Sequence, residues 1–172
     1  LTKMGKELTE AGKLPTTLQA ATFGAGCFWG VESTFRKLPG IVATSVGFSG
    51  GKKPAPSYKD VCYSETGHAE VVDVVFDPSL ISYTTLLNTF FSNHNPTTLN
   101  RQGPDEGTQY RSVVFARSDE QLAAAGTAKD ALAKSGKWSQ PIVTQVTRFE
   151  HFWPAEEYHQ TYLEKKGLDT CH

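Results

Sequence analysis

A valine-dense segment, AEVVDVVFDP at residues 69–78, constrains the fold of this sequence more than any other stretch. Its β-branched residues favour an extended strand over a helix, and the Asp-Pro pair at its end stops the strand. Side chains alternate between the two faces of a strand, so Glu70 shares a face with Val72, Val74 and Phe76. We therefore predict a strand that presents one carboxyl among apolar neighbours.

Other segments predict the elements around this strand. In chain order they are a strand over 17–26, a helix over 27–40, a strand over 41–51, a helix over 82–94, a strand over 112–116, a helix from 118 to about 136, a strand over 142–149 and a short helix within 154–166. Ser118 and Gln121 form a capping box that opens the third of these helices. With the 69–78 strand included, the order is β-α-β-β-α-β-α-β-α, which is typical of the α+β class. The first six elements of this order match a ferredoxin-like βαββαβ core. We predict a two-layer sandwich with this core, extra helices and a long irregular loop.

Composition argues against several classes of function. The 172 residues carry a net charge of -1, which offers no electrostatic attraction to nucleic acid or to an anionic membrane. No apolar run approaches the roughly 18 residues that a membrane span needs. Three cysteines without a CxxC pair, and histidines without HxxxH or HExxH spacing, argue against a metal site. An odd cysteine count suits a reducing compartment, so we expect a cytoplasmic protein, with an organelle left open because the chain begins with Leu1. We also expect a monomer.

We expect a single catalytic domain over residues 1–172. Residues 1–16 form an N-terminal extension in this prediction, and residues 165–172 form a mobile tail. The tail carries Cys171 in a polar stretch without periodicity.

The motif GCFWG places Cys27 after a glycine turn and in the first turn of the predicted helix. Backbone N–H groups without helical partners and the positive end of the helix dipole favour a thiolate there. The dipole contributes roughly 0.3–1 kcal/mol, and one pKa unit corresponds to about 1.36 kcal/mol, so the thiol pKa falls by about one unit or less. We predict that Cys27 is a nucleophile that is only partly ionised. The alternative is a buried, inert cysteine.

The two aromatic residues after this cysteine lie on different faces of the predicted helix. Phe28 belongs to the apolar face, and core packing is the alternative role for it. The other members of that face are Val31, Phe35 and Leu38. Trp29 shares its face with Glu32, Ser33 and Arg36, which we predict to be the solvent side. A tryptophan in that position, next to a cysteine, indicates the apolar lip of a binding site.

Glu70 is predicted to be desolvated by its apolar neighbours on the strand. Desolvation raises the pKa of a carboxyl toward neutrality, which suits a general acid. The alternative is a glutamate at the strand end that is turned to water. For His68, in the turn before the strand, we expect a hydrogen bond to the backbone.

The predicted loops hold further candidates. Residues 95–109 show no periodicity, and a loop of that length in a compact domain is usually functional or disordered. It contains Asp105 and leads into Tyr110. Tyr58 lies in a second loop, rich in glycine and proline, and both tyrosines are candidate hydrogen-bond donors to a polar ligand, with packing as the alternative. Cys62 lies in the middle of the same second loop, and we expect it to be structural.

Five motifs resemble the A class of peptide-methionine sulfoxide reductases. They are GCFWG (26–30), FSGG (48–51), TGHAEVV (66–72), HNPTTLNRQGPDEGTQYRS (94–112) and AEEYHQTYL (155–163), and they occur in the order of the family. The family commonly has Tyr where Phe48 stands and Asp where Asn95 stands. We therefore assign no catalytic role to these two positions.

The resemblance implies an enzyme that reduces the S epimer of methionine sulfoxide, free or in proteins. It implies that Phe28 and Trp29 hold the methyl group of the substrate, and that Asp105 holds the substrate backbone or a water molecule. The sulfoxide oxygen would receive hydrogen bonds from Glu70, Tyr58 and Tyr110. Glu70 would also supply the proton as oxygen leaves sulfur.

The resemblance also implies how the enzyme is regenerated. Cys27 attacks sulfur and becomes a sulfenic acid, and Cys171 then forms a disulfide with it, with Cys62 as the second choice for this resolving thiol. Thioredoxin or another dithiol reduces the disulfide, and no cofactor is implied. Two other functions stay open: a thiol redox sensor oxidised at Cys27, and a non-catalytic module that binds Met-containing peptides. A redox sensor would use Cys27 but would give Trp29 and Glu70 no common role. A binding module would give Cys27 no role.

Overall fold

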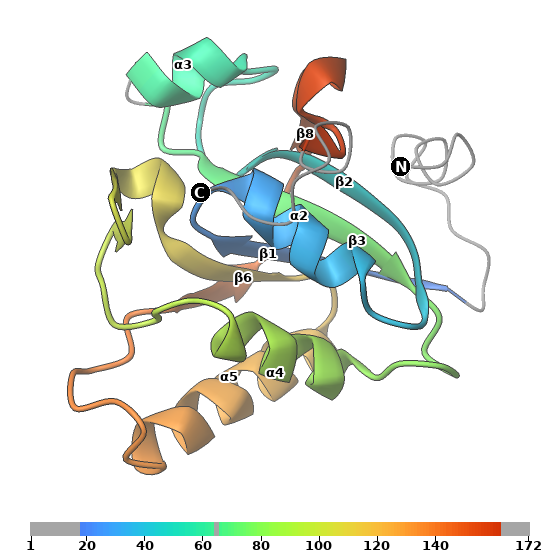
Figure 1. The fold of residues 1–172 in the computed structure, drawn as a ribbon, viewed down its shortest axis with the longest axis vertical. Coiled ribbons are helices and arrows are strands. Elements are labelled where there is room, and N and C mark those ends of the chain that lie inside the picture. The colour runs from blue at the N-terminus through green and yellow to red at the C-terminus, as the bar shows by residue number, and fades with distance from the viewer. Residues whose placement is uncertain (1–17, 64–65, 163–172) are drawn as a thin grey trace.

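The computed structural model of the protein describes residues 18–63 and 66–162, and Figure 1 shows a twisted sheet with helices packed against it. The strands of the sheet are β1 (Gln19–Ala25), β2 (Ile41–Ser49), β3 (Ala69–Phe76), β6 (Ser112–Ala116), β7 (Gln145–Arg148) and β8 (Trp153–Pro154). A separate hairpin consists of β4 (Arg101–Gln102) and β5 (Asp105–Glu106). The α-helices are α2 (Phe28–Arg36), α3 (Tyr58–Tyr63), α4 (Tyr83–Ser92) and α5 (Asp119–Lys134), and two short 3-10 helices are η1 (Thr108–Tyr110) and η2 (Glu157–His159).

The strand order β7-β6-β1-β3-β2-β8 confirms the predicted ferredoxin-like core. β3 lies between β1 and β2 and is antiparallel to both, and β1 is antiparallel to β6 on its other side. This β6-β1-β3-β2 order is the one that a βαββαβ unit produces. β7 is added parallel to β6, and α5 makes the crossover between these two parallel strands. Every residue of β3 is buried, so the valine-dense segment is an interior strand.

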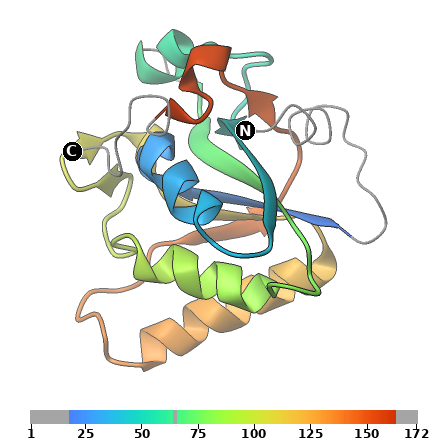
Figure 2. The same ribbon diagram turned by 45° about the vertical axis from the view of Figure 1, so that its right-hand side comes forward.

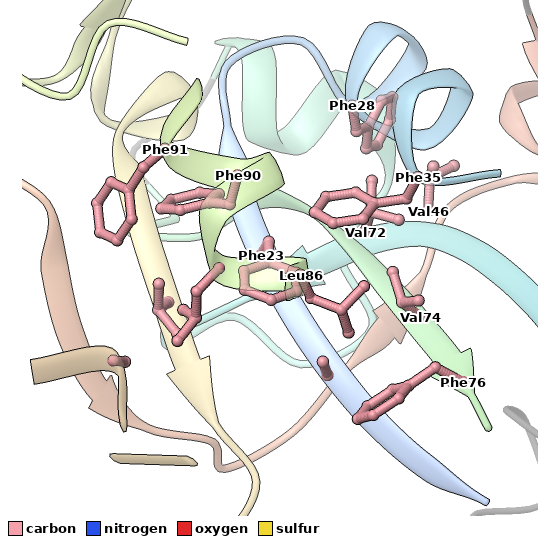
Figure 3. Close-up of a cluster of buried hydrophobic side chains, with 14 of the residues drawn as sticks. Phe23, Phe28, Phe35, Val46, Val72, Val74, Phe76, Leu86, Phe90 and Phe91 are labelled. Carbon is pink, nitrogen blue, oxygen red and sulfur yellow. The ribbon is translucent and has the colours of Figure 1, made fainter. Parts of the chain in front are cut away.

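The main core lies between the sheet and the helical layer. Figure 2 shows α4 and α5 side by side along one edge of the molecule, with α2 above them. Phe23 of β1 is fully buried, and its ring stacks on Phe35 of α2 at 5.0 Å and on Phe90 of α4 at 5.3 Å between centroids (Figure 3). Stacked rings of this kind stabilise a core beyond the area that they bury. The predicted two-layer sandwich is thus built around three aromatic rings from three elements.

The second face of the sheet is covered by the chain that follows β7. Ala69, Val71, Val113 and Phe115 form a second apolar cluster, and Phe149 and Phe152 pack against it. Because side chains alternate along β3, Val72, Val74 and Phe76 point the other way, into the main core. Glu70 therefore faces the helical layer, as the sequence pattern predicted.

Some boundaries and loops differ from the predictions. Residues 95–109 are not wholly irregular, because they contain the β4–β5 hairpin and the start of η1. The loop with two prolines contains the short helix α3. Of the short helix predicted within 154–166, the described residues up to Tyr162 contain the end of β8 and the single 3-10 turn η2, and residues 163–166 lie outside the described residues. Short elements of two to six residues carry too little periodicity to be predicted.

The start of α5 confirms the predicted cap with one change. Ser118 Oγ accepts a hydrogen bond from Gln121 N, at 3.1 Å. The side chain of Gln121 reaches back to Arg117 N, one residue before the cap, instead of to Ser118 N. In the described part of the chain, no helix is both long and apolar enough to cross a membrane.

Candidate active site

Cys27 occupies the start of α2, as the sequence predicted. β1 ends at Ala25, and Gly26 turns the chain with φ +94°, a conformation that a side chain would strain. Cys27 is the N-cap residue, and its carbonyl accepts the first helical hydrogen bond from Val31 N at 3.4 Å. The residue is half-buried. Its thiol therefore lies at the end of the helix where the dipole stabilises a negative charge.

Glu70 joins the interior strand to this helix start. Its side chain is 1% exposed, and its Oε1 accepts a hydrogen bond from Phe28 N at 3.3 Å. Phe28 is the first residue of α2 and follows Cys27 directly, so a buried carboxyl lies beside the helical turn that holds the thiol. Burial opposes ionisation of a carboxyl, because the charged form loses its hydration. The predicted desolvation of Glu70 is confirmed.

An aromatic wall stands next to this carboxyl. The rings of Phe28 and Trp29 lie 6.1 Å and 6.3 Å from the ring of Tyr58, and His159 packs against all three. Phe28 is buried, whereas Trp29 and Tyr58 are half-buried. A partly exposed wall of aromatic rings can hold an apolar group that comes from solvent.

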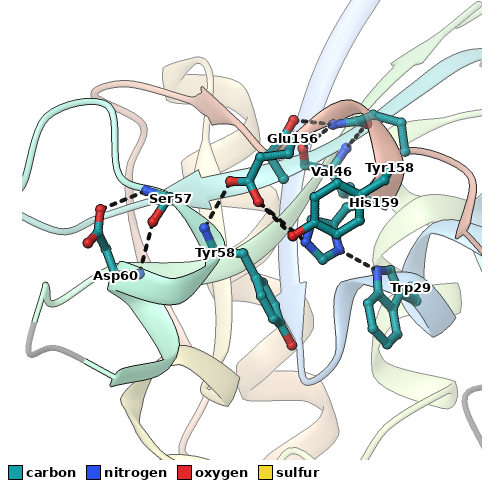
Figure 4. A network of polar contacts seen from close by, with 10 residues as sticks. Trp29, Val46, Ser57, Tyr58, Asp60, Glu156, Tyr158 and His159 are labelled. Atoms are coloured by element: carbon teal, nitrogen blue, oxygen red, sulfur yellow. Dashed lines mark hydrogen bonds and ion pairs between the residues drawn. The ribbon is translucent and has the colours of Figure 1, made fainter.

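The face of α2 that carries Trp29 does not face solvent, and that prediction was wrong. Glu32, on the same face, is 1% exposed. The chain around η2 covers this face: Trp29 Nε1 donates to His159 Nδ1 at 3.1 Å, and the Trp29 ring stacks on Tyr162 at 3.9 Å. Figure 4 shows the indole aimed at the histidine. The helix pattern showed that this face is polar, but it could not show that the face is covered, because the covering segment lies about 130 residues further along the chain.

Glu156 connects this segment to α3, a link that the sequence did not reveal. Its Oε1 accepts a hydrogen bond from Tyr58 N at 2.9 Å, and its Oε2 lies 3.5 Å from His159 Nε2 (Figure 4). Burial lowers the pKa of His159. In the neutral ring Nδ1 accepts from Trp29, so Nε2 carries the proton and faces the carboxylate. His159 thereby fixes the orientation of the Trp29 ring, and Glu156 ties the backbone of Tyr58 to the same segment.

The two predicted tyrosine donors lie with Glu70. Burial raises the pKa of Tyr58 above its usual range, and hydrogen bonding to Cys62 and the charge of Glu70 add to this effect. Burial and the charge of Glu70 likewise raise the pKa of Tyr110. Both hydroxyls therefore keep their protons well above neutral pH and act as hydrogen-bond donors.

Cys62 lies closer to this group than its place in the sequence suggested. It is part of α3, and the hydroxyl groups of Tyr58 and Tyr110 lie close enough to its sulfur to lower the pKa of the Cys62 thiol, against the larger effect of burial. Burial raises the pKa of the Cys62 thiol. A thiol with a raised pKa is a poor nucleophile at neutral pH, in keeping with the structural role predicted for it.

Asp105 reaches the site from the β4–β5 hairpin. It is half-buried and lines a cavity of about 340 Å³ together with Cys27. The rest of the lining comes mainly from α2, from α4 and from the hairpin. The long loop therefore brings a carboxylate to the cavity that the cysteine lines. His68 is bonded to the backbone as predicted, with its ring nitrogens near Gly51 N at 3.0 Å and Lys53 O at 2.6 Å.

The two positions that depart from the family pattern have structural roles. Phe48 is fully buried, and its ring lies 5.7 Å from that of Phe28, so it packs beneath the aromatic wall. Asn95 Oδ1 accepts from Thr97 N at 2.9 Å, and its backbone N and O are both bonded to the side chain of Gln102. These contacts shape the start of the loop that carries Asp105.

Several predictions fall on residues that the structure does not describe. The N-terminal extension at 1–16, the tail at 165–172 and Cys171 lie outside the described residues. Within residues 18–63 and 66–162, no group of three or more His, Cys, Asp and Glu side chains is arranged to hold a metal ion.

Comparison with known proteins identifies the family of this chain. A family model described as peptide methionine sulfoxide reductase matches residues 19–172. The peptide methionine sulfoxide reductase MsrA of Methanoculleus marisnigri is 56% identical over 155 residues, which cover 90% of this chain and 94% of the relative. The crystal structure of Mxr1 from Saccharomyces cerevisiae in reduced form has a TM-score of 0.83 and 40% identity, covering 90% of this chain and 88% of that chain. Mxr1 in complex with Trx2 has a TM-score of 0.62 and 28% identity, covering 87% of each chain. The chain therefore belongs to the peptide methionine sulfoxide reductase family, and it is an oxidoreductase that reduces methionine sulfoxide.

Proposed function

We propose that the chain reduces the S epimer of methionine sulfoxide, free or in proteins, through a sulfenic acid on Cys27. The hydrogen bond from Phe28 N to Glu70 Oε1 is the observation that carries this proposal. It places a buried carboxyl, a candidate acid, at the helical turn that Cys27 caps. A nucleophile and an acid side by side are what removal of oxygen from sulfur requires.

The aromatic wall receives the substrate. The methyl group packs against Phe28 and Trp29, and the sulfoxide oxygen accepts hydrogen bonds from Tyr58 and Tyr110. The raised pKa values of both tyrosines support this role, because a phenol that keeps its proton is available to donate a hydrogen bond to a developing oxyanion. Asp105, which shares a cavity with Cys27, holds the substrate backbone or a water molecule.

The chemical step moves one oxygen and two electrons. The Cys27 thiolate attacks the sulfur of the sulfoxide while the protonated Glu70 donates its proton to the departing oxygen. A bond forms between the two sulfur atoms as the bond between the substrate sulfur and its oxygen breaks, and the oxygen leaves as hydroxide. This hydroxide then attacks the Cys27 sulfur, the bond between the two sulfur atoms breaks, and methionine departs as the thioether. The substrate sulfur is thereby reduced by two electrons, and the Cys27 sulfur is oxidised to a sulfenic acid. An ionised Glu70 would repel the thiolate, so the carboxyl and the thiol titrate as a coupled pair.

Cys171 resolves the sulfenic acid in this proposal. Its thiol attacks the Cys27 sulfur, a disulfide forms as the bond between the Cys27 sulfur and its oxygen breaks, and the hydroxyl group takes the proton of the Cys171 thiol and leaves as water. Burial raises the pKa of Cys62, the other candidate, which makes it a poor nucleophile at neutral pH. Thioredoxin then reduces the disulfide, a role supported by the complex of the yeast relative Mxr1 with Trx2. We further propose that residues 1–172 act as one catalytic domain and as a monomer in the cytoplasm, where dithiol reductants are available.

Separated epimers of N-acetyl methionine sulfoxide test the proposal. With a thioredoxin, its reductase and NADPH, NADPH consumption should follow the S epimer alone. The Cys27→Ser variant should show no turnover, because a hydroxyl is a far weaker nucleophile than a thiol. Cys171→Ser should release about one methionine per enzyme and then stop. Equal rates with both epimers, or turnover by Cys27→Ser, would contradict the proposal.

A further inference from the structure

The cavity beside Cys27 lies on a different side of α2 from Trp29. Val31 and Thr34 of α2 line it together with Cys27 and Asp105. A helix turns about 100° per residue, so Val31 and Thr34 lie about 140–160° around the axis from Trp29. The indole of the aromatic wall and this cavity therefore lie on opposite sides of the helix start that carries Cys27.

The floor of the cavity is apolar. It is formed by Val31 together with Phe35 of α2 and Phe90 of α4, and these two phenylalanines are 1% and 2% exposed. Asn93 and Pro104, which also line the cavity, are exposed, so the cavity opens to solvent. An apolar group that enters it displaces water from the floor, which favours binding.

The polar side chains of the lining offer few hydrogen bonds to a ligand. Three of them already donate to backbone carbonyl oxygens: Thr34 to Gly30 at 3.1 Å, Thr89 to Thr85 at 3.0 Å, and Gln102 to Asn95 at 2.8 Å. Among the described residues around the cavity, Asp105 is the one acidic residue, and none is a lysine or an arginine. The cavity therefore disfavours a polar occupant and repels a negatively charged one.

We propose that this cavity binds an apolar side chain next to methionine sulfoxide in a protein substrate. The inference rests on the proposed function, in which Asp105 holds the substrate backbone. Asp105 also lines the cavity, and the next residue of a bound chain begins only about 3.8 Å further on. Consecutive side chains of an extended chain point to opposite sides, so one can reach the aromatic wall while its neighbour enters the cavity.

The size of the cavity fits this occupant. Its volume of about 340 Å³ is at the lower end of the range for ligand sites, roughly 300–1,000 Å³, and is enough for one side chain of the size of leucine. The preferred substrate is therefore methionine sulfoxide in an extended apolar segment. Such segments are buried in folded proteins and become accessible when a protein unfolds.

The test uses the S epimer of methionine sulfoxide in blocked dipeptides that carry Leu, Gly or Asp either before or after it. For each peptide, kcat/KM with dithiothreitol as reductant is divided by kcat/KM for N-acetyl methionine sulfoxide, which has no neighbouring residue. This ratio isolates the contribution of the neighbour. Wild type is compared with Thr89→Lys, which puts a positive charge into the cavity, and with a control, Asn88→Lys, at an exposed position on α4 that does not line it.

In wild type, the ratio for Leu should exceed the ratio for Gly about tenfold in at least one of the two positions, the effect of a small apolar group in a hydrophobic pocket. The ratio for Asp should fall about threefold below that for Gly, and added salt should reduce this deficit because it screens the charge of Asp105. Thr89→Lys should lower the ratio for Leu and raise the ratio for Asp, whereas Asn88→Lys should keep the wild-type ratios.

Equal ratios for Leu and Gly in both positions of wild type would overturn the inference, whatever the variants do. Wild-type ratios in Thr89→Lys would also overturn it, as would the same change in Asn88→Lys, because the preference would then arise outside the cavity. If Thr89→Lys instead slows formation of the Cys27–Cys171 disulfide at unchanged ratios, the cavity holds the chain's own end and the inference fails. Wild-type protein that does not reduce N-acetyl methionine sulfoxide would refute the proposed function itself, and the inference with it.

Discussion

Acidification between about pH 6.5 and pH 4 should destabilise the fold through His94, at the start of the loop that carries Asp105. His94 Nδ1 lies 2.6 Å from Phe90 O, and Nε2 lies 2.7 Å from Ser112 Oγ. A carbonyl can only accept, so Nδ1 carries the proton and Nε2 accepts from the serine hydroxyl. The folded protein therefore holds the neutral ring, and burial lowers the pKa of His94 from 6.5 to about 4.

The magnitude follows from this difference. Between the two pKa values the unfolded chain binds a proton at His94 and the folded protein does not, so the free energy of unfolding falls as the pH falls. The interval of about 2.5 units corresponds to about 3 kcal/mol at 1.36 kcal/mol per unit. The loss should begin near pH 6.5 and be complete near pH 4.

Urea unfolding at several pH values, with wild type and His94→Gln, measures this effect. Burial lowers the pKa of His159 as well and raises the pKa values of Glu32 and Asp73, but these groups are present in both proteins and cancel in the difference. The variant should be less stable at pH 7 and should lose less stability toward pH 4. Parallel curves for the two proteins across this range would refute the reasoning.

Three further substitutions test the site and its support. Glu70→Gln should slow methionine release in a single turnover by about 10²- to 10⁴-fold, because the amide cannot supply a proton, and a rate near wild type would reduce Glu70 to a packing residue. Trp29→Ala should raise KM for N-acetyl methionine sulfoxide. It should also lower the melting temperature, because it removes the hydrogen bond to His159, worth about 1 kcal/mol, and the ring contacts of Trp29. An unchanged KM would show that Trp29 does not contact the substrate. Gly47→Ala should lower stability to urea by about 1–3 kcal/mol, because the added Cβ would overlap the carbonyl of Trp153, and an unchanged midpoint would contradict that close approach.

Periodicity was enough to predict the core and its buried carboxyl. The alternation along 69–76 placed Glu70 on the inner face, and the order of strands and helices predicted the ferredoxin-like sheet. Both results depend on neighbours along the chain, whose spacing the sequence shows directly. The glycine before Cys27 and the helix after it likewise predicted the position of the thiol.

The surroundings of α2 could not be predicted in the same way. A polar helix face is normally the solvent face, yet Glu32 is buried because Thr44 and Thr161 supply partners from distant parts of the sequence. Trp29 is covered for the same reason, by His159. Cys62 was placed in a loop because six residues of helix show no clear period, and its tyrosine partners come together only in the folded chain.

The central claim is that the Cys27 sulfur takes the oxygen of the substrate, and one reductant-free turnover tests it most directly. Cys171→Ser, with Cys27 and Cys62 intact, is mixed with the S epimer of N-acetyl methionine sulfoxide and dimedone, and the products are quantified by peptide mass mapping. We expect about one methionine per enzyme and an equal amount of dimedone adduct, all of it on Cys27. Methionine released without an adduct on Cys27, or an adduct on Cys62 in its place, would contradict the account.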